Sequence, residues 1–410
     1  MNTPKIRFKG FTDAWEQRKF GDYNDLMTGY PFESDKFSED GIKLVRGMNV
    51  KRGYLDFSGD ICVKWNSCVG LENFLLKDGD ILIQMDGALI GKSYAKIKEN
   101  QLPALLVQRV TRARTNNKFA SQDFMYQTIQ RDFLRYIEMN KTETAVPHLS
   151  LNDIRNFEIM VPCLAEQKKI GEYFDSLDNL ITLHQRKCDE TKQLKKFMLQ
   201  KMFPKNGEKN PEIRFEGFTD DWEQRKLGEV SSKITKKNQD IVVDEVFTNS
   251  AEYGIISQRD FFDKDIANFE NIDGYYIVEP NDFVYNPRIS TTAPFGPIKR
   301  NKLERTGAMS PLYYVFRPHD IDLSYLECFF QTSCWHTFMR FNGNTGARSD
   351  RFAITDKVFD EMPISMPQDI EEQQKIGSYF SSLDNLITLH QRKCEKLKEL
   401  KKFMLQNMFV

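Results

Sequence analysis

The segment Gly87-Ala88-Leu89-Ile90-Gly91-Lys92-Ser93 is the part of the sequence that comes nearest to a nucleotide-binding loop. A P-loop needs a glycine five residues before Gly91, but Asp86 holds that position and its carboxylate would oppose a phosphate. The residues after Ser93 have the pattern of a strand, so no helix N-terminus would face an anion. The segment therefore predicts a glycine-rich turn between strands, with a loop that faces DNA as the functional variant.

Other catalytic signatures are incomplete. Adenine methyltransferases carry an Asn/Asp-Pro-Pro-aromatic motif, and Asn286-Pro287-Arg288 lacks its second proline and its aromatic residue. A metal-dependent nuclease would need clustered carboxylates with a lysine, for which Asp80, Asp86 and Lys92 are the nearest candidates. The sequence thus offers no complete catalytic constellation, which disfavours a stand-alone nuclease or methyltransferase.

Metal ligation and histidine catalysis are also disfavoured. Cys328, Cys334 and His336 lack a fourth ligand and the usual C-x₂₋₄-C spacing, so they are expected to be packed structural residues and no metal is predicted. His184 and His390 fall on helical seams, where a packed polar spacer is the expected role. Seven scattered cysteines fit a reducing cytoplasm better than a disulfide framework.

Polar residues gather instead in loops of the two variable middle segments. Arg, Lys, Asn, Gln, Ser, Thr and Tyr are the side chains that contact phosphates and base edges of DNA. The location recurs, because 141–150 and 344–351 each come shortly before the last strand of a middle segment. The predicted DNA-binding residues are Arg46, Gln84, Lys92, Ser93, Tyr94, Lys141, Thr142, His148, Tyr285, Asn286, Arg288, Ser290, Thr291, Asn344, Thr345, Arg348, Ser349 and Arg351.

The elements that carry these loops occur in a duplicated chain. Residues 6–23 match 213–230 at 13 of 18 positions, and 166–203 match 372–409 at 30 of 38 positions. The two offsets, 207 and 206, are nearly equal, so the sequence is a tandem duplication with constant flanks. The middle segments themselves show no convincing similarity. We expect domains at 1–165 and 209–371 and conserved helices at 166–208 and 372–410.

The constant tails are predicted helices. Apolar and semi-apolar positions recur at alternating steps of four and three, which is a heptad seam, and Leu180, Leu183, Leu194 and Met198 widen the apolar face. A long rod with such a face needs a partner, and the simplest partner is its own copy. The predicted helix-pair interface consists of Ile170, Phe174, Leu177, Ile181, His184, Cys188, Ile376, Phe380, Leu383, Ile387, His390, Cys394 and Leu397.

A pseudo-two-fold axis perpendicular to the helices would make them antiparallel and place one middle segment at each end of the pair. Both middle segments read as mixed α/β. Strands are expected at 80–85, 93–98, 281–286 and 312–317, and helices at 119–139 and 324–341. Further strands are expected at the ends of 151–161 and 358–366. The fold class is therefore α+β, with two mixed domains joined by two long helices paired as an antiparallel coiled coil.

Composition bounds the class of protein. The 410 residues carry 58 basic and 59 acidic side chains, a formal net charge of −1, which excludes a generally basic coat for nucleic acid but not local basic surfaces. The sequence has no run of about 18 apolar residues, so no membrane segment is expected.

The motifs IRFxGFTDxWEQRKxG and EQxKIGxYFxSLDNLITLHQRKC, each present twice and in order, resemble the specificity subunits of type I restriction-modification systems. The resemblance covers the whole chain. It implies two target-recognition domains that each read one half of a bipartite site in double-stranded DNA, with the helices setting the unread spacer.

The resemblance also implies partners and cofactors. Two methyltransferase subunits would bring S-adenosylmethionine and the adenine-methylating site, and two restriction subunits would bring ATP and Mg²⁺. This chain would then bind no cofactor and catalyse nothing itself. The alternative from the residues is a scaffold that binds protein partners rather than DNA.

Overall fold

The computed structural model describes residues 3–87, 89–140, 148–205, 207–261, 269–345 and 350–410. The chain forms two compact units. The first unit comprises residues 1–185 together with 391–410, and the second comprises 186–390. Each unit therefore contains one head, formed by a variable middle segment and its flanks, and parts of two long helices. Neither α4 (Leu164–Lys201) nor α10 (Ile370–Asn407) belongs to one unit alone.

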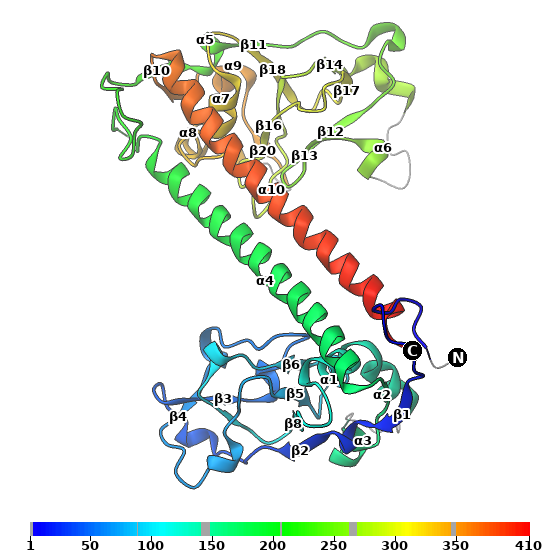
Figure 1. Cartoon of the computed structure of the whole chain (residues 1–410). Helices are drawn as coiled ribbons and strands as arrows, with labels where there is room; N and C mark the ends of the chain where they lie inside the picture. Colours follow the sequence, from blue (N-terminus) through cyan, green and yellow to red (C-terminus); the bar gives the residue numbers. More distant parts are fainter. Residues whose placement is uncertain (1–2, 88, 141–147, 206, 262–268, 346–349) are drawn as a thin grey trace. The chain divides into compact units, whose positions relative to one another are not determined.

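The first head is built around an antiparallel sheet of order β2-β8-β5-β6, beside a smaller sheet of order β4-β3-β7 (Figure 1). A separate pair joins β1 to β9, and three short helices complete the head. The strands are β1 (Glu16–Lys19), β2 (Asn24–Thr28), β3 (Ile42–Val45), β4 (Lys64–Trp65), β5 (Ile81–Gln84), β6 (Tyr94–Lys96), β7 (Ala104–Leu106), β8 (Val110–Thr115) and β9 (Glu158–Val161). The helices are α1 (Gln122–Thr128), α2 (Leu134–Asn140) and α3 (Leu151–Arg155).

The second head repeats the main sheet in the order β11-β18-β15-β16 and the flanking pair as β10-β21. Its further pairs are β12-β13, β14-β17 and β19-β20. The strands are β10 (Glu223–Lys226), β11 (Ser231–Lys233), β12 (Phe247–Ser250), β13 (Gly254–Ser257), β14 (Tyr276–Val278), β15 (Phe283–Tyr285), β16 (Ile298–Arg300), β17 (Gly307–Met309), β18 (Tyr314–Pro318), β19 (Asn344–Thr345), β20 (Phe352–Ala353) and β21 (Pro363–Met366). The helices are α5 (Leu227–Val230), α6 (Gln258–Phe261), α7 (Leu323–Phe329), α8 (His336–Asn342) and α9 (Asp356–Asp360).

The two middle segments thus share a sheet topology that their sequences do not reveal. Main-chain hydrogen bonds form the ladders, so buried side chains of different shape satisfy the same strand order. Three expected helices are different. The helix over 119–139 contains a π-helical turn, Ile129–Phe133, between α1 and α2, and the helix over 166–208 ends at Lys201 in α4. The helix over 324–341 is interrupted between α7 and α8. Thr332 Oγ1 donates to the carbonyl of Phe329 at 2.7 Å and accepts from Cys334 N–H at 3.2 Å, and this local bonding ends α7.

The repeated opening motif fastens each head to the start of its own long helix. Arg7 donates from Nε and Nη2 to the two carboxylate oxygens of Glu166 at 2.7 and 2.8 Å, and Arg214 does the same to Glu372. Both glutamates are buried, and this two-point geometry satisfies their charge. Hydrogen bonding to Glu166 raises the pKa of Arg7, which keeps the guanidinium charged.

The same motif also holds the end of the other long helix. Ile6 N–H donates to the carbonyl of Asn407 at 2.9 Å, and Ile213 N–H donates to the carbonyl of Lys201 at 2.9 Å. These carbonyls lie in the last turns of α10 and α4, where helix carbonyls lack partners within the helix. The motif therefore joins the beginning of one helix to the end of the other within each unit.

The two long helices run antiparallel within each unit. In the first unit Lys401 Nζ donates to Asp178 at 2.6 Å, and Cys394 Sγ lies 4.0 Å from the carbonyl of Ile181. Partner numbers on α10 fall as those on α4 rise, which defines the antiparallel direction. In the second unit the repeat-equivalent pair is Lys195 and Asp384.

The predicted seam residues lie in three environments. Ile170, Phe174 and Leu177 are buried in the core of the first head, and Ile376, Phe380 and Leu383 are buried in that of the second. Cys188 and Cys394 are buried farther along the helices. The remaining members are half-buried: Ile181, His184, Ile387, His390 and Leu397. The first turns of each seam thus pack mainly on a head.

Glycines mark the place where each helix crosses its head. A Cβ on Gly171 would lie 2.8 Å from Asp123 Cβ and 3.0 Å from the backbone nitrogen of Phe124. Gly377 stands at the repeat-equivalent position, where a Cβ would lie 2.7 Å from Ser324 Cβ. These contacts leave no room for a side chain, so the α4–α1 and α10–α7 packing requires glycine.

We expect Gly171→Ala to lower the thermal unfolding midpoint of the chain, although alanine is normally the better helix residue by about 1 kcal/mol. Overpacking against α1 should outweigh that gain by on the order of 1–3 kcal/mol. Ser176→Ala, an exposed position five residues later in α4, serves as the control and should change the midpoint little. A higher midpoint for Gly171→Ala would contradict the close packing.

Candidate nucleic-acid interface

Three segments of the first head meet where β5 ends. Met85 N–H donates to the carbonyl of Arg109 at 2.9 Å, and Leu149 N–H donates to the carbonyl of Met85 at 2.7 Å. The backbone at Asp86 also pairs with His148. These bonds define one edge of the head, at the end of β5. Because they are main-chain bonds, they hold this edge together whatever side chains it carries.

Polar side chains crowd this edge. Gln84 Nε2 donates to the carbonyl of Asp86 at 2.7 Å, and Arg109 Nη1 donates to Asp86 Oδ2 at 2.7 Å. Arg109 is 69% exposed, so its ion pair is accessible to solvent and easily exchanged for another anion. Its backbone has φ +69°, the left-handed region, which turns the chain sharply into β8.

The second head builds the same edge at the end of β15. Phe352 N–H donates to the carbonyl of Pro287 at 2.8 Å, and the backbones of Arg288 and Arg351 pair. Met85 and Pro287 accept the equivalent bond in the two heads, so Asp86 corresponds to Arg288 and His148 to Arg351. The location that recurs in the sequence therefore recurs in space on a common backbone scaffold.

Asn286 anchors the turn that follows. Its Nδ2 donates to the carbonyl of Asn249 at 2.8 Å, while its Oδ1 accepts from Arg288 N–H at 3.0 Å. Ser290 Oγ accepts from Ala293 N–H at 3.1 Å and closes the next turn. Arg288 and Arg351 are both exposed, on two segments whose backbones pair at these residues.

The predicted DNA-binding residues occupy three environments. The exposed ones are Lys92, His148, Arg288, Ser290, Thr291, Asn344, Thr345 and Arg351, and the half-buried ones are Arg46, Gln84 and Asn286. Ser93, Tyr94 and Tyr285 are buried. Lys141, Thr142, Arg348 and Ser349 lie outside the described residues.

The buried and half-buried members have partners inside the head. Tyr285 donates its hydroxyl to the carbonyl of Phe295 at 2.9 Å, and burial raises the pKa of Tyr285 and of Tyr94. Arg46 Nη2 donates to the carbonyl of Ile61 at 2.9 Å. The exposed residues are therefore the better candidates for contacting a ligand.

Sequence reasoning missed Arg109 and Asp86 as parts of this edge. The signal available was the short Val-Gln-Arg-Val turn before β8, which brings Arg109 to the end of the neighbouring strand. The sequence presents Asp86 as an obstacle to phosphate and as a candidate nuclease carboxylate, but in the structure its carboxylate accepts a hydrogen bond from Arg109.

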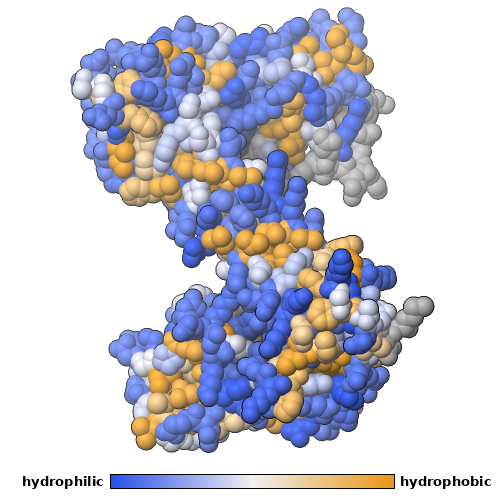
Figure 2. Space-filling model, viewed as in Figure 1, coloured by the Kyte–Doolittle hydropathy of each residue, from blue (hydrophilic) through white to orange (hydrophobic). Residues whose placement is uncertain are grey.

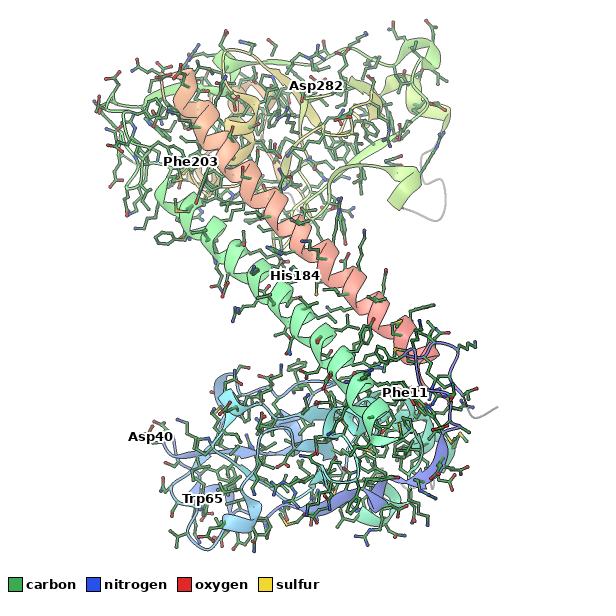
Figure 3. The ribbon with its side chains drawn as sticks, viewed as in Figure 1. Phe11, Asp40, Trp65, His184, Phe203 and Asp282 are labelled. Carbon is green, nitrogen blue, oxygen red and sulfur yellow. The ribbon has the colours of Figure 1, made fainter. Side chains whose placement is uncertain are left out.

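A matched ion pair braces the opposite end of the same strands. Arg114 on β8 donates two hydrogen bonds to Asp80 at 2.7 and 2.6 Å, and Arg317 on β18 donates two to Asp282 at 2.7 and 3.0 Å. Asp282 is labelled in the second head in Figure 3. Both aspartates are buried, and each also accepts a backbone N–H from the preceding turn. The brace fixes β5 and β15 against the strand beside them.

The incomplete motifs have structural roles. Residues 89–92 form turns shortly before β6, with Lys92 N–H donating to the carbonyl of Leu89 at 2.9 Å. Burial raises the pKa of Cys328 to about 12, and the ring of His336 packs 4.5 Å from that of Trp335. Among the described residues, no three His, Cys, Asp or Glu side chains gather as a metal site.

Comparison with known proteins identifies the family. The model of the type I restriction modification DNA specificity domain matches residues 12–193 and again 219–399. The chain belongs to the type I restriction-modification specificity family. Both matches span a head and most of a long helix, in agreement with the duplication. In the part of the chain that the structure describes, no helix is both long and apolar enough to cross a bilayer.

Curated members of the family are similar over part of their length. The EcoAI specificity subunit of Escherichia coli is 27% identical over 168 residues, which is 40% of this chain and 28% of that subunit. The EcoBI specificity subunit of Escherichia coli is 23% identical over 277 residues, 66% of this chain and 50% of that subunit. The aligned regions thus cover half or less of these relatives' own length.

The fold matches a solved member. A crystal structure of the type I restriction-modification S subunit from M. genitalium has a TM-score of 0.66, with 13% identity, and the match covers 100% of this chain and 99% of that one. At this identity the likeness concerns the fold, which is the α+β class with two mixed domains and a helix pair predicted from the sequence.

Proposed function

We propose that the chain is the DNA-reading subunit of a type I restriction-modification complex, in which each head reads one half of a bipartite site. The observation that carries the proposal is the polar edge at the end of β5 and β15. In each head one equivalent main-chain bond, from Leu149 to Met85 or from Phe352 to Pro287, and one adjacent backbone pairing build this edge. Its exposed side chains are Arg109 and His148 in one head but Arg288 and Arg351 in the other. Two different readers on one scaffold suit a site with two unlike halves.

The chemistry of the edge suits base reading. Arginine pairs in two-point fashion with guanine, and Asn or Gln pairs with adenine, through the major groove. The half-sites would lie on the order of one helical turn apart, with the helix pair setting the unread spacer. A net charge of −1 implies that partner subunits supply much of the phosphate contact.

Exposed apolar side chains on the long helices support the docking of partner subunits. In the first unit they are Leu180, Leu400 and Phe403, and in the second they are Leu194, Phe197, Leu386 and Leu389. Figure 2 shows apolar surface over these helices. Leu180, Leu194 and Phe197 repeat as Leu386, Leu400 and Phe403, so each unit offers an equivalent patch, as two copies of one methyltransferase subunit would need.

In this proposal the chain holds no cofactor of its own. The methyltransferase partners would bring S-adenosylmethionine, and two restriction subunits, where present, would bring ATP and Mg²⁺. The complex would act on DNA in the cytoplasm. A scaffold that binds only proteins is the competing function, and the polar edges favour DNA over it.

The decisive experiment is methylation sequencing of a host genome that expresses this chain with its methyltransferase partner. We expect adenine methylation at one split sequence, with two specific parts and an unread gap. A gel-shift of the same complex on that duplex should show salt-sensitive binding. Methylation at no split sequence, with no protection of any duplex, would favour the scaffold.

We expect Arg351→Ala to relax recognition in one half-site only. Loss of one two-point contact to a base typically removes about 1–3 kcal/mol of discrimination. The measurement is the binding constant of the complex on a panel of single-base variants of the site. Arg259→Ala, an exposed arginine elsewhere in the second head, is the matched control. Equal weakening on every sequence would instead make Arg351 a phosphate contact. Arg348, to which the sequence assigns the same role, lies outside the described residues.

We expect Leu194→Asp with Phe197→Asp to weaken assembly with the methyltransferase subunit while leaving the unfolding midpoint nearly unchanged, because both side chains are already exposed. Analytical size exclusion of the mixed subunits measures the effect, and one of two copies of the partner should be lost. Lys192→Asp, an exposed position on the opposite side of the same helix from Leu194 and Phe197, is the control. Full assembly of the double variant would place docking elsewhere.

A further inference from the structure

A tyrosine-lined pocket adjoins the polar edge of the second head. Its volume is about 520 Å³, within the range of small-molecule sites. Pro287 and Phe352 belong to both features, since they form the main-chain bond that builds the edge. A ligand held at the edge would therefore lie beside the mouth of the pocket.

The floor of the pocket is a rigid aromatic cluster. Tyr285 and Phe359 stack with ring centroids 4.8 Å apart, and Tyr314 packs on Phe359 at the same distance. Tyr314 donates its hydroxyl to Asp360, and Tyr285 donates to the carbonyl of Phe295. Both tyrosines are thereby fixed and nearly buried, so they form a rigid floor, and the ring surface open to a ligand belongs to the half-buried Tyr276 and Tyr313.

The open sides combine aromatic rings with polar groups. Tyr276 and Tyr313 are half-buried, and the hydroxyl of Tyr313 lies 3.3 Å from that of Thr248. The exposed amides of Asn342 and Asn344 stand at the rim and carry both donors and acceptors. Flat apolar faces with amides at the edge match the chemistry of a heteroaromatic ring.

The first head has different residues at the equivalent positions. Tyr285 pairs with Tyr314 across the β15–β18 ladder, and in the first head Ile83 pairs with Thr111. The equivalents of Pro287 and Phe352 there are Met85 and Leu149, both buried. The aromatic lining is therefore a property of the second head and not of the shared scaffold.

We propose that this pocket receives a planar base turned out of the DNA duplex beside the half-site read by the second head. The proposal rests on the proposed function, and it adds a base-binding site to a head whose edge reads bases within the groove. Enzymes that hold extruded bases do so by stacking between aromatic side chains and by hydrogen bonds to the base edge. The tyrosines and rim amides provide those two kinds of contact.

The test uses the full chain assembled with its methyltransferase partner and duplexes of the site found by methylation sequencing. Each base opposite the second half-site and its flanks is replaced in turn by a mismatch, and binding is measured by fluorescence anisotropy. A base that must leave the stack binds better when it is unpaired. We expect one mismatch, other than at the methylated adenine, to tighten binding about fivefold.

Pocket variants connect that position to the tyrosines. Tyr313→Ala and Tyr276→Ala should weaken binding to the matched duplex about tenfold and abolish the gain from the mismatch, whereas Tyr313→Phe should retain both. Tyr54→Ala, a 59% exposed tyrosine of the first head, is the control. Because Tyr276 and Tyr313 pack on a core cluster of the second head, the alanine variants should melt at a lower temperature. Binding is therefore measured well below their midpoints, and unchanged recognition of the first half-site shows that the variants are folded.

Two results would overturn the pocket proposal while leaving the proposed function in place. One is the absence of any tightening mismatch outside the methylated adenine. The other is a gain that persists in Tyr313→Ala, which would place the extruded base elsewhere or indicate a different occupant. Failure to find any split methylated site would overturn the proposed function and, with it, this inference.

Discussion

The apolar pair at the end of each long helix packs into a head built mainly from the other half of the sequence. Met408 and Phe409 lie in the core of the first head, where Phe409 contacts Trp15 and Phe174. Met202 lies in the core of the second head with Phe203, which is visible at the end of α4 in Figure 3. Burial of one large apolar side chain contributes about 1.5–3 kcal/mol to stability. The core of the first head is therefore incomplete without the end of α10, and the core of the second without the end of α4.

That exchange explains why the constant regions are long and nearly identical. Each helix begins on its own head and ends in the other, so its length and register are fixed at both ends. The ion pairs Asp178–Lys401 and Lys195–Asp384 occupy equivalent positions between those ends. Burial and a neighbouring lysine lower the pKa of Lys401, and Asp178 opposes that shift by stabilising the charged form. A change in one copy of the tail would need a matching change in the other.

The variable segments have more freedom because their shared features lie in the main chain. The edge at β5 and at β15 depends on bonds between peptide groups, and the braces Arg114–Asp80 and Arg317–Asp282 keep those strands in place. Side chains at the edge can then differ without loss of the fold. This separation between a fixed frame and exchangeable contacts is what a DNA reader with two unlike half-sites requires.

Much of the frame is predictable from the sequence. The repeat gives the two helices, their antiparallel pairing and the recurrence of polar loops, because a heptad seam and a duplicated motif are local patterns. The common topology of the heads is not predictable in this way, since Ile83 and Tyr285 occupy the same ladder position with unlike side chains. Between α7 and α8 the backbone forms short turns, and the Thr332 hydroxyl adds a bond to the carbonyl of Phe329, a feature that the helical pattern of 324–341 does not reveal.

The candidate site also has features that the sequence predicts and features that only the structure shows. The sequence by itself determined that Arg288 and Arg351 are residue types that can contact DNA. It also determined that a polar segment recurs before the last strand of each half. Only the tertiary structure decided that Tyr94 and Tyr285 face the core and that Arg109 joins the edge. It also decided that, among the described residues, aromatic side chains line a pocket beside the edge of the second head but not at the equivalent positions of the first. The physical reason is that burial and adjacency depend on contacts between residues distant in the chain, whereas composition and period are properties of neighbouring residues.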